Sequence, residues 1–97
     1  MGDYMELIEK LKDVHDFPCE YVFKAVGDNS EAFEKGVKGA ISGHLSEDDL
    51  ETLIMDRRES RGGKHVGLTV RVRVPDAKTV IDIHESLADV PGTRFVL

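Results

Sequence analysis

Histidine and cysteine are the residue types that most often perform chemistry, and this chain has four histidines and one cysteine. The histidines fall on four different predicted elements or their ends, so they form no close-spaced pair typical of a metal site. Cys19 would need a nearby base and an orienting group to act as a nucleophile, but its strand pattern predicts that it faces the core. The carboxylates cluster on predicted helix surfaces. We therefore predict a non-enzymatic chain with no catalytic residue, metal or cofactor; the histidines are His15, His44, His65 and His84.

The run Gly62-Gly63-Lys64 resembles a phosphate-binding loop only in composition. The full pattern requires a serine or threonine after the lysine and then a helix. Here His65 and an alternating strand pattern follow the lysine, so we reject a nucleotide phosphate site at this position.

Charged residues are unevenly distributed along the chain, and this is the clearest sign of a functional surface in the sequence. Residues 1–51 contain five basic and thirteen acidic residues, whereas residues 52–97 contain eight basic and six acidic residues. The basic excess gathers in a predicted hairpin over residues 57–73, where Glu59 is the one acidic residue. We predict that its six cations form a ligand- or partner-binding surface: Arg57, Arg58, Arg61, Lys64, Arg71 and Arg73.

Several occupants fit such a surface. Arg71 and Arg73 alternate with buried-type valines, so they share the open face of the predicted sheet and could bind an acidic protein, a phosphorylated metabolite or RNA. RNA-recognition sheets stack bases on aromatic side chains, but the outward positions of strand 66–74 carry none, which makes nucleic acid the less favoured alternative. In a purely structural alternative, the arginines pair with Glu20 and with the acidic N-terminal helix, which could cover the open face.

Hydrophobic spacing divides the chain into a helix followed by a β-α-β-β-α-β order. Helices are predicted over residues 4–14, from an N-cap at Ser30 to about residue 44, and after an N-cap at Asp76. Strands are predicted over residues 19–26, 66–74 and 93–97. The apolar stripe of the first helix consists of Tyr4, Leu7, Ile8, Leu11 and Val14.

Residues 45–61 carry two conflicting signals. Ser46 begins a sequence typical of a capping box, which favours a short helix. The loop composition at 60–64 and the alternating strand after it require a hairpin partner, and residues 51–59 are the only candidate nearby. With a strand there, the order predicts an α+β, ferredoxin-like βαββαβ fold: an antiparallel four-stranded sheet, with the first and third strands central, and two helices on one face, plus the N-terminal helix.

Length and composition set limits on the class of protein. A chain of 97 residues with 40% apolar residues is long enough for one domain, predicted over 17–97 after an N-terminal amphipathic helix at 1–16. The net charge of −6 argues against wholesale binding of nucleic acid or anionic membranes. The acidic start lacks a signal peptide, no apolar run approaches the ~20 residues of a membrane span, and the single cysteine favours a reducing compartment. We therefore expect a cytoplasmic protein.

The chain resembles the YbeD-like family of small uncharacterised bacterial proteins. The resemblance rests on Phe17-Pro18 before the run at 21–27, on the loop at 60–64 before the valine-rich strand, and on the terminal residues 94–97. It spans about residues 17–97, implies a ferredoxin-like fold, supports a strand at 51–59 and supplies no catalytic residues. That fold is similar to the regulatory ACT domains, which bind small ligands, so a regulatory role is implied by analogy of fold.

These observations lead to one hypothesis and one alternative. The first is a regulatory or adaptor module that binds a partner protein or a small metabolite through the 57–73 hairpin. The alternative is a nucleic-acid-binding module that uses the same arginines, and a steep salt dependence of affinity would distinguish it. The sequence leaves open whether the domain forms a homodimer.

Overall fold

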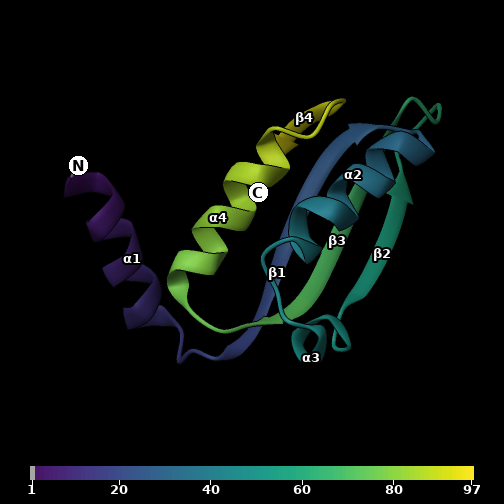
Figure 1. Cartoon of the computed structure of the whole chain (residues 1–97). Coiled ribbons are helices and arrows are strands. Elements are labelled where there is room, and N and C mark those ends of the chain that lie inside the picture. Colours follow the sequence, from purple (N-terminus) through teal and green to yellow (C-terminus); the bar gives the residue numbers. More distant parts are fainter. Residues whose placement is uncertain (1) are drawn as a thin grey trace.

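The computed structural model describes residues 2–97, with side chains from Met5 onward. It has the α+β composition that the sequence predicts, and Figure 1 shows four strands curved beside the helices. The elements are α1 (Gly2–Val14), β1 (Cys19–Asp28), α2 (Glu31–Ser42), α3 (Glu47–Leu50), β2 (Ile54–Glu59), β3 (His65–Val74), α4 (Ala77–Ala88) and β4 (Thr93–Val96).

The four strands form one antiparallel sheet in the order β2-β3-β1-β4. The two central strands, β1 and β3, pair along their full ten residues, from Cys19 opposite Val74 to Asp28 opposite His65. The edge strands are shorter. The expected antiparallel four-stranded sheet, with the first and third strands in the middle, is therefore what the chain forms.

The core lies between one face of the sheet and the helices α2 and α4, which both lie on that face (Figure 1). Alternate residues of β1 and β3 point toward the helices because successive strand side chains point to opposite faces. Burying each large apolar side chain contributes about 1.5–3 kcal/mol. The fully buried side chains include Phe23, Phe33, Val37, Ile41, Val66, Leu68, Val70, Val72, Val74, Val80, Ile83 and Leu87.

The predicted helix caps at Ser30 and Asp76 are confirmed. The Ser30 hydroxyl accepts a hydrogen bond from the backbone N–H of Phe33 at 3.1 Å. Helix α2 begins at Glu31, directly after this N-cap. The Asp76 carboxylate accepts bonds from the Thr79 hydroxyl at 2.7 Å and the Thr79 backbone N–H at 2.8 Å. These bonds hold the pKa of Asp76 below its usual value because they favour the ionised form.

Residues 45–61 form both of the elements that the sequence suggested, first a short helix and then a strand. Ser46 caps the short helix α3, and β2 begins only at Ile54, so the strand expected over 51–59 starts three residues late. The delay has a physical reason, since Thr52 is still bonded to the turn, its N–H donating to Asp49 at 3.1 Å. The Thr52 hydroxyl also accepts a hydrogen bond from the backbone N–H of Arg73 at 2.9 Å. This bond satisfies an N–H of β3 that would otherwise need a partner on a longer β2.

Helix α1 lies beside α4 rather than over the open face of the sheet (Figure 1). Leu7 and Leu11 border a cavity of about 260 Å³ with Tyr21 and two side chains of α4, Val80 and Ile81. The alternative in which this acidic helix covers the open face is therefore wrong. The predicted stripe residue Tyr4 has a side chain outside the described residues. None of the helices within residues 2–97 has the length and apolar character needed to cross a bilayer.

Candidate binding site

The face of the sheet opposite α2 and α4 is not covered by any helix within residues 2–97 (Figure 1). Strand register identifies its members, because residues directly opposite each other on paired strands share a face. Val26, for example, lies opposite Gly67 on one side and Phe95 on the other. We call this surface the open face; it consists of Glu20, Val22, Lys24, Val26, Asp28, Ile54, Asp56, Arg58, His65, Gly67, Thr69, Arg71, Arg73 and Phe95.

The open face combines exposed apolar side chains with positive charge. Val22, Ile54 and Phe95 are 49%, 57% and 51% exposed, although residues of these types are usually buried. Apolar contact area among charges is typical of a surface that another molecule covers. The face has four side chains of lysine or arginine, Lys24, Arg58, Arg71 and Arg73, against three acidic ones, Glu20, Asp28 and Asp56, in a chain whose net charge is −6.

A shallow cavity of about 470 Å³ occupies this face where β2, β3 and β1 run side by side. Gly67 forms part of its floor, because this central position of β3 has no side chain. A Cβ placed there would lie 3.8 Å from the Arg58 carbonyl oxygen and 3.9 Å from both Lys24 Cε and Val26 Cγ2. Those are ordinary van der Waals distances, so a side chain would fit. A glycine within a strand often marks a place where another molecule approaches the backbone closely.

Two cations flank this hollow, Lys24 from β1 and Arg58 from β2. Within the part of the chain that has described side chains, neither residue forms an ion pair, and neither does Arg71. Unpaired guanidinium and ammonium groups keep all their hydrogen-bond donors available for carboxylates. The open face therefore presents cations that the fold itself does not use.

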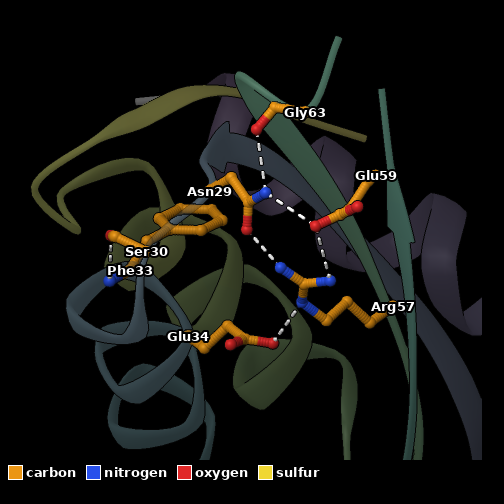
Figure 2. A network of polar contacts seen from close by, with 7 residues as sticks. All are labelled: Asn29, Ser30, Phe33, Glu34, Arg57, Glu59 and Gly63. Atoms are coloured by element: carbon orange, nitrogen blue, oxygen red, sulfur yellow. Dashed lines mark hydrogen bonds and ion pairs between the residues drawn. The ribbon is translucent and has the colours of Figure 1, made fainter. Parts of the chain in front are cut away.

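Arg57, by contrast, faces α2 and is held in a polar network (Figure 2). Its Nε lies 3.0 Å from Glu34 Oε1, its Nη1 lies 3.3 Å from Glu59 Oε1, and its Nη2 donates to Asn29 Oδ1. The Asn29 amide donates to Glu59 at 2.9 Å and to the Gly63 carbonyl at 2.8 Å. The bonds from Asn29 and then Arg57 lower the pKa of Glu59. The network ties the β2–β3 turn to the start of α2.

The six cations predicted as one surface thus fall into separate environments. Arg58 and Arg71 lie on the open face and form no ion pair with a described side chain, whereas the Arg73 guanidinium lies 3.9 Å from Asp49. Arg73 is also opposite Glu20 in the strand register, the pairing that the structural alternative expected, although the ion pair it forms is with Asp49. Arg61 and Lys64 are exposed in the turn between β2 and β3.

Sequence reasoning missed the members of the site that come from outside the hairpin. The period-two pattern of residues 19–26 already places Lys24 and Val26 on one face. Phe95 joins Val26 only because β4 pairs with β1, a contact between residues about seventy positions apart. Gly67 was visible as the one glycine in the alternating strand, which was the available signal for a hollow.

The histidines and the cysteine form no shared centre. His15 lies 5.1 Å from the Tyr21 ring, and His84 lies 5.2 Å from the Phe23 ring, where burial lowers the pKa of His84. Cys19 is half-buried, and burial followed by the charge of nearby Asp16 raises its pKa, which disfavours the reactive thiolate. Among the described residues, no three His, Cys, Asp or Glu side chains are placed to hold a metal ion.

Comparison with known proteins assigns the family. Residues 12–97 match the model of the family described as Protein of unknown function (DUF493). The chain belongs to the DUF493 family. This match confirms the resemblance to the YbeD-like proteins.

DUF493 relatives of the chain have nearly the same length. A UPF0250 protein of Shewanella putrefaciens is 32% identical over 88 residues, which is 91% of this chain and 96% of the relative. A UPF0250 protein of Paraburkholderia phytofirmans is 28% identical over 86 residues, which is 89% of this chain and 94% of the relative. Both names describe uncharacterised proteins, so they support the family and no activity.

A solved structure supports the fold of the DUF493 chain. The uncharacterized protein TM1266 from Thermotoga maritima superimposes with a TM-score of 0.59 over 80% of this chain and 90% of that protein. The two sequences are 15% identical, so the likeness concerns the fold alone.

Proposed function

We propose that this DUF493 chain is a non-enzymatic regulatory or adaptor module that binds an acidic partner protein through its open face. The observation that carries the proposal is the uncovered sheet face, where exposed apolar side chains lie among cations, and where Lys24, Arg58 and Arg71 form no ion pair with another described residue. The strand order β2-β3-β1-β4 supports a ferredoxin-like, ACT-like fold, and a regulatory role follows by analogy with that fold. We place its action in the cytoplasm, where Cys19 stays reduced.

A protein fits this surface better than a nucleic acid. Apart from His65 at the start of β3, the central strands present no aromatic side chain on the open face on which a base could stack; they present Val22 and Val26 there instead. The acidic residues Glu20 and Asp56 lie on the same face and would repel a continuous phosphate backbone. Exposed apolar side chains surrounded by charge are the composition of a protein–protein interface.

A partner of different sequence also fits better than a second copy docked face to face. A two-fold axis through the open face would set its excess of basic side chains against the same excess on the other copy. Such juxtaposition of like charges opposes binding. An acidic partner gains attraction from the same residues.

Capture of partners from the source cell tests this proposal. We would immobilise the parent chain, an Arg58→Glu/Arg71→Glu variant and a Lys35→Glu/Lys38→Glu variant, and identify retained proteins by mass spectrometry with and without nuclease. The two variants change net charge equally, but Lys35 and Lys38 are exposed on α2, away from the open face.

The expected result is a protein with an acidic surface that survives nuclease, is lost with the open-face variant and is retained by the α2 variant. Retention by the open-face variant would contradict the assigned surface. Loss of the captured material on nuclease treatment would replace the proposal with the nucleic-acid alternative.

A further inference from the structure

We propose that the hollow at Gly67 receives one aliphatic side chain of an acidic partner segment, whose neighbouring carboxylates pair with Lys24 and Arg58. This inference rests on the proposed function and specifies the chemistry that the open face recognises. The partner segment is therefore an apolar residue between acidic residues, rather than any acidic surface.

The shape and lining of the hollow support an aliphatic side chain. Gly67 leaves the floor without a side chain, and Val26 Cγ2 and Lys24 Cε each lie 3.9 Å from the position of an added Cβ. The methylene stem of lysine is apolar, so Lys24 contributes hydrocarbon at the base of the hollow and charge at its mouth. Phe95, beside Val26 in the register and half exposed, extends the apolar surface toward β4.

The charges on either side of the hollow select carboxylates. Arg58 lies directly opposite Gly67 on β2, and Lys24 projects from β1 two residues away from Val26, the β1 residue opposite Gly67. The two cations therefore come from opposite sides of β3. Neither is paired with another described residue, so no internal ion pair has to break when a carboxylate binds. Arg57 does not contribute, because Glu34, Glu59 and Asn29 already hold its guanidinium (Figure 2).

The hollow also provides polarity that orients the segment. Thr69 and Asp56 border it on one side, and His65 and Ser60 border it on the other. Thr69 has Lys24 opposite it on β1 and Asp56 opposite it on β2, so a carboxylate at that end of the hollow is attracted toward β1 and repelled from β2. Beside Gly67, Arg58 attracts a second carboxylate on the β2 side. The aliphatic side chain of the segment then fills the hollow at Gly67.

Peptide titration followed by NMR tests the inference. The probes are three blocked pentapeptides, each with one central residue and two flanking residues on either side. The first has leucine flanked by four acidic residues, the second has alanine flanked by the same four, and the third has leucine flanked by four lysines. Each is titrated into the uniformly 15N-labelled full chain. We expect the acidic leucine peptide to shift the backbone amides of the open face around Gly67, and to bind about tenfold more tightly than the acidic alanine peptide. The lysine peptide should not bind there.

Two variants and one control assign the effect to the hollow. Gly67→Val fills the hollow and should bring the leucine and alanine peptides to within about twofold of each other, since the remaining charge attraction is common to both. Lys24→Gln/Arg58→Gln should weaken both acidic peptides together. Gly39→Val adds the same side chain to an exposed position of α2, where nothing lies within 4 Å of the new Cβ, and should change neither affinity.

The outcomes separate this inference from the proposed function. If the parent binds the leucine and alanine peptides equally, and binding is lost only in the Lys24→Gln/Arg58→Gln variant, the role of the hollow is refuted. That result would leave the open face as a docking surface for an acidic partner. Shifts confined to another surface, or none at millimolar peptide, would overturn the inference, and the capture experiment would decide the proposed function separately. Dimerisation of the free chain through the same amides would replace the acidic segment with a second copy.

Discussion

Replacing Gly67 with valine should stabilise the protein, which is unusual for a change at the centre of a sheet. The backbone of Gly67 is not in the left-handed region, and an added Cβ meets its nearest neighbours at 3.8–3.9 Å, so valine enters without strain. Glycine is among the residues that strands disfavour and valine among those they favour, on a scale that spans about 1 kcal/mol. The added Cβ itself lies 3.9 Å from Lys24 Cε and from Val26 Cγ2, which are ordinary contact distances.

We therefore expect the free energy of unfolding to rise by about 1 kcal/mol, which corresponds to an increase of about 4–8 °C in Tm for a domain of this size. Thermal unfolding followed by circular dichroism, at fixed protein concentration, measures the change. A Tm equal to or below that of the parent would refute the reasoning, because it would mean that the floor of the hollow is not open to a side chain.

Gly27 on the neighbouring strand β1 provides the opposite case. A Cβ at Gly27 would lie 2.4 Å from Phe33 Cε1 and 2.6 Å from the Gly92 carbonyl oxygen, closer than atoms can approach. Gly27→Ala should therefore destabilise the protein by about 1–3 kcal/mol through overpacking. Opposite signs at these two glycines would separate the effect of the hollow from a general effect of glycine replacement.

Three further changes test other parts of the structure. Asp76→Ala should lower the free energy of unfolding by about 0.5–2 kcal/mol in denaturant titrations through loss of the α4 cap, whereas Asp76→Asn retains most of it. Arg57→Ala should raise the pKa of Glu59 toward its ordinary value, as measured by NMR titration, and an unchanged pKa would contradict the network. Burial lowers the pKa of His84, so the unfolded chain takes up protons first as pH falls below about 6.5, and stability declines there. His84→Phe should reduce that decline in urea midpoints measured between pH 7.5 and 5.5, and an equal decline in parent and variant would exclude His84 as its cause.

Local signals in the sequence were sufficient for most elements of the fold. The caps at Ser30 and Asp76 were predictable because each side chain bonds a backbone N–H only three residues away. The alternation of residues 66–74 identified both β3 and its buried face, since one side of the sheet meets the core along its whole length. Residues 45–61 were harder, because a local cap and a distant strand partner act on adjacent residues.

Glycines in α2 show how packing lies beyond local rules. Gly36 allows a close contact with the end of α4, because the atom nearest to its added Cβ is Val90 Cγ1, only 2.5 Å away. Gly39 has nothing within 4 Å, and Gly43 is the C-cap rather than part of the helix. Three similar residues within eight positions thus have three different roles, which depend on neighbours from elsewhere in the chain.

The sequence by itself determined the order of the elements, the buried faces of the central strands and the excess of positive charge between residues 57 and 73. These follow from spacing and composition, which act over a few residues. Only the tertiary structure decided which of those charges are available, because neighbouring positions on an edge strand point to opposite faces. Arg57 meets Glu34 of α2, whereas Arg58 lies opposite Gly67 on the open face, across β3 from Lys24 of β1. The different environments of Arg57 and Arg58 depend on strand pairing and helix placement, which join residues distant in sequence. The candidate site exists only because of those long-range contacts.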